Sequence, residues 1–157
     1  MDKHFELTDK FIINAFGIKL LQIKCTRKIK HADVGDLGGY IEKEDNLSGD
    51  AWVSGDAKVY GNAQVCGDAQ VSGNAQVSGD AKVSNNNEHC GFDCFGSANR
   101  HTHAYKTQSG KVEIICGCFR GSIEEFEEQV KKTHQGNEFE RQYMAIAEVI
   151  KIKLGLK

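Results

Sequence analysis

Residues 49–84 read GDAWVS GDAKVY GNAQVC GDAQVS GNAQVS GDAKVS, which is six consecutive units with the pattern Gly-[Asp/Asn]-Ala-x-Val-x. An internal repeat of fixed length is a dominant indicator of fold. The apolar position continues toward the N-terminus at the same spacing, to Leu47 and Ile41. The repeat therefore defines a segment over residues 41–84.

Each unit has the composition of a short strand followed by a tight corner. Valine is β-branched and fits a pleated surface, and the alanine two residues before it points to the same side. Glycine followed by Asp or Asn tolerates the positive φ that a tight corner needs. A period of six matches neither a helix nor one long alternating strand. Strands and corners should therefore alternate through the segment.

The pattern resembles the hexapeptide repeat of left-handed parallel β-helices, in which three units form one triangular coil. The resemblance implies that residues 18 apart stack, with Val53 against Val71 and the valines inside. The ends of so short a coil expose unpaired backbone and need caps or partner chains. The expected fold class is mainly β: a short left-handed parallel β-helix with an N-terminal β cap and a C-terminal ββα or ββαα domain.

The flanking segments suggest how the ends are covered. Apolar residues on either side of residues 14–17 predict a hairpin in the N-terminal cap. Near the C-terminus we expect strands over residues 101–107 and 111–119, one helix capped by Ser122 and a second capped by Asn137. The predicted organisation is an N-terminal cap over 1–40, a β-helix over 41–84, a linker over 85–100 and a C-terminal domain over 101–157.

Outward positions of the repeat offer an interaction surface. A rigid coil would display on its flat faces the side chains of Trp52, Lys58, Tyr60, Gln64, Gln70 and Gln76. Such faces suit a protein partner or a second copy of the chain, so self-association into a dimer or trimer is expected.

Histidines and cysteines near the C-terminal hairpin form a candidate metal site. If the hairpin has a two-residue loop at Ser109 and Gly110, His101 faces Cys118 and His103 faces Cys116, a donor set that suits zinc. A three-residue loop instead places both histidines on the opposite face from both cysteines. Buried thiols are the alternative interpretation. Apart from this candidate zinc, the sequence indicates no cofactor.

The basic residues between 24 and 31 form the only cationic cluster of the sequence. Lys24, Arg27, Lys28 and Lys30 could contact phosphates, but no interleaved aromatic residues support base stacking, so a solvated strand face is the simpler interpretation. The chain has 20 basic and 22 acidic residues and a net charge of −2, which argues against a nucleic-acid-binding protein as a whole.

Several function classes find no support in the sequence. It contains no phosphate-binding glycine loop, GxSxG nucleophile elbow or HExxH zinc motif, so we expect a protein without catalytic residues. It also shows no membrane-spanning run and no signal peptide. Six cysteines without an export signal favour a reducing compartment, and we expect a cytoplasmic location.

Residues 41–84 resemble the left-handed β-helix acyltransferases, typically trimers with a catalytic histidine on a loop that leaves the coil. No loop or histidine interrupts these coils, and only His31 and His89 lie near them. An acyltransferase therefore remains as an alternative function. A zinc-containing nucleic-acid-binding regulator is a second alternative.

A resemblance over nearly the whole chain involves GDLGGYIEKEDNLS at 35–48, the repeats, CGCFRGSIEEF at 116–126 and KTH at 132–134. These segments look like a group of small phage and prophage β-helix proteins without an established activity. By analogy with small phage accessory proteins, the resemblance implies a non-enzymatic module that binds a host protein. An inhibitor of host defence, such as an anti-CRISPR, is the most specific version of this expectation.

Overall fold

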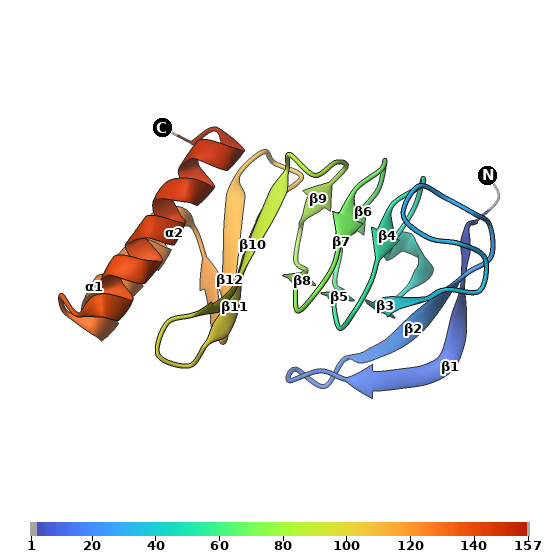
Figure 1. The fold of residues 1–157 in the computed structure, drawn as a ribbon, viewed down its shortest axis with the longest axis horizontal. Coiled ribbons are helices and arrows are strands. Elements are labelled where there is room, and N and C mark those ends of the chain that lie inside the picture. Colours follow the sequence, from blue (N-terminus) through green and yellow to red (C-terminus); the bar gives the residue numbers. More distant parts are fainter. Residues whose placement is uncertain (1–2, 157) are drawn as a thin grey trace. The chain divides into compact units, whose positions relative to one another are not determined.

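The computed structural model describes residues 3–156 and is mainly β, with helices α1 (Ile123–His134) and α2 (Glu138–Leu154) near the C-terminus (Figure 1). The chain divides into two compact units, Met1–Asn86 and Asn87–Lys157. They are called here the N-terminal and the C-terminal unit, and each is described by itself.

The repeats of the N-terminal unit form short parallel strands that stack with an offset of 18 residues (Figure 1). Val53 pairs with Val71, as expected, and Leu47 bridges to Val65. Strand order is β3-β5-β8, β4-β7 and β6-β9. The strands are β3 (Leu37–Ile41), β4 (Trp52–Val53), β5 (Lys58–Val59), β6 (Gln64–Val65), β7 (Gln70–Val71), β8 (Gln76–Val77) and β9 (Lys82–Val83), and a short 3-10 helix covers Glu44–Asn46.

Valines and alanines of the repeat fill the interior of this coil. The repeat valines and Ile41 are fully buried, and Leu47 is almost fully buried. Strands paired with the 18-residue offset lie on successive levels of the coil. Backbone hydrogen bonds join these levels, for example from Trp52 N to Ala69 O at 3.0 Å. Burial of so many β-branched side chains against one another stabilises strands that, at two residues each, are too short to be stable alone.

The corners of the coil depend on glycine. Gly67 has a φ of +62°, in the left-handed region that side-chain-bearing residues rarely adopt. A Cβ atom built on Gly67 would lie 2.1 Å from the carbonyl oxygen of Ser84, on the next level. Both the conformation and the close approach of the backbones therefore require glycine here.

An antiparallel hairpin precedes the coil, as the sequence predicts. Strand β1 (Phe5–Ile13) pairs with β2 (Lys19–Cys25), and the Asn14 side chain accepts hydrogen bonds from the backbone N–H groups of Phe16 and Ile18, both at 2.9 Å. Strand β1 begins earlier than the apolar pattern suggested. Strand β2 also pairs with β3, so the hairpin and the strands β3, β5 and β8 belong to one sheet.

The C-terminal unit contains an antiparallel sheet of order β10-β11-β12-β13. Its strands are β10 (His89–Phe95), β11 (Arg100–Lys106), β12 (Val112–Cys116) and β13 (Phe119–Gly121). Strand β10 lies where the sequence predicted a linker over 85–100. Its Gly91 and Asp93 are poor strand formers, and pairing with β11 outweighs that weak propensity. Gly117, with a φ of +60°, also breaks the expected strand 111–119 into β12 and β13.

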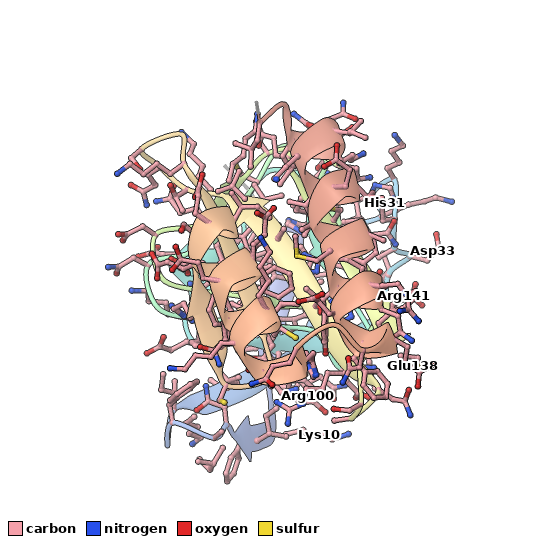
Figure 2. All side chains as sticks on the ribbon, turned by 90° about the vertical axis from the view of Figure 1, so that its left-hand side faces the viewer. Lys10, His31, Asp33, Arg100, Glu138 and Arg141 are labelled. Carbon is pink, nitrogen blue, oxygen red and sulfur yellow. The ribbon has the colours of Figure 1, made fainter. Side chains whose placement is uncertain are left out.

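Helices α1 and α2 lie side by side against the sheet (Figure 2). Their starts agree with the prediction: Ser122 Oγ accepts from Glu125 N at 3.1 Å, and Asn137 Oδ1 accepts from the N–H groups of Phe139 and Glu140. The apolar faces of both helices form the core between helices and sheet, and Phe139 is half-buried. The buried helix residues are Ile123, Phe126, Val130, Tyr143, Ile146, Ala147, Ile150 and Leu154.

Candidate functional site

The predicted flat interaction surface is largely covered. Trp52 is only 2% and Tyr60 only 5% exposed, so the expectation that they are displayed was wrong. The ring of Trp52 lies 6.1 Å from that of His4, and Tyr60 packs with Leu20 and Tyr40. The N-terminal residues fold back over these faces because large aromatic side chains gain more by burial than by exposure. Lys58, Gln70 and Gln76 are half-buried, and Gln64 is exposed.

Exposed apolar residues gather instead at the end of the β1–β2 hairpin. Phe11, Ile13 and Phe16 are 50%, 57% and 68% exposed, and we call these three residues the hairpin tip. Ile12 and Ile18 of the same hairpin pack against Leu20, Tyr40 and Tyr60. Successive side chains of β1 point to opposite sides of the hairpin. One side therefore packs against the core, and the other side is apolar and exposed to solvent.

The proposed zinc ligands are not brought together. Strand β11 pairs with β12 so that Thr102 faces Cys116 and His103 faces Ile115. This is the register of a three-residue loop at 108–110, closed by the hydrogen bond from Thr107 N to Lys111 O. His101 and His103 therefore lie on the opposite face from Cys116, and Cys118 is exposed in the turn before β13. Among residues 3–156, no three His, Cys, Asp or Glu side chains are arranged so that they could hold a metal ion.

Cys116 matches the alternative interpretation as a buried thiol. Its sulfur accepts a hydrogen bond from Thr102 Oγ1 at 3.2 Å and lies 3.8 Å from Tyr143 Oη. Burial and the neighbouring Cys116 raise the pKa of Tyr143 to about 12. Burial also raises the pKa of Cys90 to about 11, which keeps that thiol protonated and unreactive at neutral pH.

A row of hydrogen-bonded histidines crosses strands β10 and β11. His89 Nδ1 lies 3.0 Å from His103 Nε2, and His103 Nδ1 lies 3.0 Å from His101 Nε2. His101 Nδ1 then lies 2.6 Å from Asp93 Oδ1. We call these four residues the histidine chain. If β10 had been predicted as a strand, the two-residue spacing of His89, Gly91 and Asp93 would have placed these residues on one face and indicated the histidine chain.

The carboxylate at one end fixes the direction of these hydrogen bonds. Asp93 accepts, so His101 Nδ1–H donates to it and His101 Nε2 accepts from His103 Nδ1–H. His103 Nε2 accepts in turn from His89 Nδ1–H. Burial, and to a lesser extent the neighbouring His89 and His101, hold the pKa of His103 well below its usual value. His103 therefore stays neutral, and the three rings form a chain of hydrogen bonds that all run in one direction, toward Asp93.

Most of the predicted basic cluster is engaged in ion pairs. Arg27 contacts Asp50 at 3.1 Å, Lys28 contacts Asp33 at 3.2 Å and Lys30 contacts Asp68 at 3.7 Å, whereas Lys24 is exposed. Asp50 and Asp68 occupy equivalent corners of successive levels, where like charges would repel. Arg27 and Lys30 relieve that repulsion, which gives the basic residues a role within the coil.

A groove of about 960 Å³ lies beside these corners, entirely within the N-terminal unit. The charged residues that line it are Lys3, Arg27, Glu44, Asp45, Asp50 and Asp68. Lys3 forms an ion pair with Glu44, as Arg27 does with Asp50. Four carboxylates and two cations thus face the groove, which leaves it with an excess of negative charge.

His4 also lines the groove and is only 1% exposed. Its Nε2 lies 2.7 Å from the carbonyl oxygen of Ala51, and since a carbonyl can only accept, Nε2 carries the proton. Nδ1 then bears a lone pair. Burial lowers the pKa of His4, so this ring stays neutral and Nδ1 remains an acceptor. Sequence patterns gave no signal of this buried histidine.

Comparisons with known proteins give no further information on function. No protein-family model, no curated protein and no solved structure matches this chain. Within the described residues, neither helix has the length and apolar character needed to cross a membrane.

Proposed function

We propose that this chain is a non-enzymatic interaction module that binds another protein through the hairpin tip. The observation that carries the proposal is the gathering of Phe11, Ile13 and Phe16 at one end of the hairpin, each at least half exposed. Contiguous exposed apolar side chains on soluble proteins usually mark interaction sites. Aromatic anchors of this kind tend to supply most of the energy of a protein–protein interface.

The surroundings of the hairpin tip support this role. Asn14 orders the turn with hydrogen bonds to Phe16 N and Ile18 N, and Ile12 and Leu20 fix the base of the hairpin. An ordered anchor loses little conformational entropy on binding. The ammonium of Lys19 lies 4.4 Å from the centroid of the Phe11 ring and adds a positive charge at the rim.

The partner we propose is a protein of the bacterial host cytoplasm. This assignment rests on the resemblance of residues 35–48, 116–126 and 132–134 to small phage and prophage proteins. Its most specific form is an inhibitor of a host defence system, such as an anti-CRISPR. The same resemblance supports a left-handed coil, which the six-residue period and the 18-residue offset between strands also favour.

Replacing Phe16 by Ser should weaken partner binding by tenfold or more, since an aromatic hot spot contributes about 2 kcal/mol. The wild-type chain and this variant are immobilised, proteins retained from a host lysate are quantified by mass spectrometry, and the Kd of the retained protein is then measured. Val34→Ser is the matched control, because Val34 is 67% exposed in the same unit but lies outside the hairpin tip. Thermal unfolding should be nearly unchanged in both variants.

A partner that binds wild type, Phe16→Ser and Phe11→Ser equally well would contradict the assignment to the hairpin tip. Sedimentation of the same variants tests self-association as the other use of this surface. If Phe16→Ser converts a wild-type dimer or trimer into a monomer and no host protein is retained, the partner is a second copy of the chain.

A further inference from the structure

We propose that the partner protein adds an extended, acidic segment as a further strand to the free edge of β1, at residues 11–13. The inference rests on the proposed function, because it states how the partner binds beside the hairpin tip. Strand β1 is the last strand of its sheet, with β2 on one side and no strand of residues 3–156 on the other (Figure 1). Extended peptides bind to sheet edges of this kind through main-chain hydrogen bonds.

The main chain of β1 directs hydrogen-bonding groups toward this free edge. Across the hairpin turn, Asn14 N donates to Ile18 O at 3.0 Å. Hydrogen-bonded pairs alternate along an antiparallel ladder, so Ile12 is the next residue of β1 that bonds to β2. Phe11 and Ile13 lie on either side of Ile12. Their N–H and C=O groups therefore point away from β2, toward the free edge.

The same two residues also expose their side chains, Phe11 by 50% and Ile13 by 57%. A strand placed against this edge can therefore bond to their main chain and cover their side chains on one face of the sheet. In this mode of binding, the main-chain hydrogen bonds supply affinity and alternate side chains supply specificity. Because side chains alternate along a strand, the partner segment should carry an apolar residue at every second position.

The earlier part of β1 is protected against such pairing, whereas residues 11–13 are not. A bulge interrupts the register after Leu7, and within it Lys10 N donates to Thr8 Oγ1 at 3.3 Å. This part of the strand also carries the exposed charges of Glu6 and Lys10. Bulges and charged side chains are common means by which edge strands avoid pairing with other chains. The pairing site is therefore confined to the three apolar residues next to the turn.

The charge beside this edge favours an acidic segment over a second copy of the chain. Residues 10–19 contain Lys10 and Lys19 and no carboxylate. Both lysines are exposed, and neither forms an ion pair within residues 3–156. A second copy would bring the same two cations to the edge, where like charges repel. A segment that carries carboxylates next to its apolar residues would instead pair with both lysines.

The direct test uses the synthetic peptide acetyl-Glu-Val-Thr-Val-Thr-Val-Glu amide as the probe. In an extended conformation its valines share one face, and its ends carry carboxylates for Lys10 and Lys19. Binding to the full chain is followed by NMR chemical shifts and amide hydrogen exchange. Saturating peptide should slow exchange of the Phe11 and Ile13 amides about tenfold or more, and leave the Ile12 amide, already bonded to β2, nearly unchanged. The same peptide with lysine at both ends should bind about tenfold more weakly.

Two variants of one residue isolate the main-chain contact. Ile13→Pro removes the outward N–H group, and because this group takes no part in the ladder with β2, the edge strand tolerates proline there. Ile13→Ala is the matched control, since it removes the same apolar side chain but keeps the N–H group. The proline variant should bind the peptide about tenfold more weakly than the alanine variant, because it loses a hydrogen bond and its ring obstructs the incoming strand. Thermal unfolding should be similar for the two variants.

Equal binding of the peptide to Ile13→Pro and Ile13→Ala would overturn the inference, as would binding that leaves the exchange of the Phe11 and Ile13 amides unchanged. Equal affinity for the glutamate-ended and lysine-ended peptides would overturn the choice of an acidic segment. If the wild-type chain forms a dimer that Ile13→Pro dissociates, and the peptide does not bind, a second copy occupies the edge and the inference fails.

These outcomes are distinguishable from failure of the proposed function. If Phe16→Ser loses the protein retained from the host lysate, while Ile13→Pro and Ile13→Ala retain it equally, the hairpin tip binds the partner without strand addition. If the peptide pairs with β1 but no host protein depends on Phe16, the edge accepts strands and the proposed function fails.

Discussion

Gly67→Ala is expected to destabilise the N-terminal unit by about 3 kcal/mol or more, a large fraction of the stability of an ordinary domain. The positive φ of +62° costs an alanine about 1 kcal/mol. The larger part comes from the new methyl group, which would lie 2.1 Å from Ser84 O and 3.2 Å from the carbonyl carbon of Ser84. These are backbone atoms, and Ser84 O also accepts from Asp68 N, so the clash can be relieved only by separating two levels of the coil.

Gly35→Ala is the matched control for this effect. Gly35 also has a positive φ, +94°, and lies in the same unit, but a Cβ atom there would meet nothing within 4 Å. Gly35→Ala should therefore lower the unfolding free energy only by the conformational cost of the positive φ, about 1 kcal/mol. Urea unfolding followed by the fluorescence of Trp52, the only tryptophan of the sequence, reports on this unit directly. Equal destabilisation by the two substitutions would show that the corners of the coil are not in contact.

Acidification below about pH 6.5 is expected to destabilise the C-terminal unit through His103. Burial depresses the pKa of His103 well below the value of 6.5 that it has in the unfolded chain. As the pH falls below 6.5, the unfolded chain therefore binds a proton that the folded chain does not. The unfolding free energy should decrease by up to about 1.4 kcal/mol per pH unit until the folded pKa is reached.

The dependence on pH distinguishes this effect from a simple loss of packing. His103→Phe removes the titrating group and should flatten the slope of stability against pH between 6.5 and 5, whatever it does to stability at pH 7. His134→Gln is the control, since His134 belongs to the same unit but lies outside the histidine chain. Amide hydrogen exchange of Ile114 and Ile150, both fully buried, measures the opening free energy of the unit at each pH. An unchanged slope in His103→Phe would refute the role assigned to this residue.

The coil could be predicted from the sequence because its information is local and repeated. Gly, Ala and Val return every six residues, and the expected partners, such as Val53 and Val71, are indeed paired. The helix starts were predictable for a similar reason, because the side chains of Ser122 and Asn137 act on backbone groups only two or three residues away.

The candidate sites were harder to predict because they depend on packing between distant segments. Trp52 occupies an outward position of the repeat, so its position in the sequence indicates exposure. In the folded protein, His4 and neighbouring N-terminal residues cover it. The zinc hypothesis depended on a loop one residue shorter than the one observed, which changes the face of every histidine relative to the cysteines. The hairpin tip was not predicted from the sequence, because an apolar residue in a strand is more often buried than exposed.

The 18-residue offset between paired strands limits how this protein can change in length during evolution. Deleting or duplicating one hexapeptide would move the point where the chain leaves the coil to a neighbouring ladder of strands, and each later repeat strand would pair with a different repeat. Three hexapeptides gained or lost together preserve each pairing and only lengthen or shorten the stack. Natural variants of this protein should therefore differ in their repeats by multiples of 18 residues.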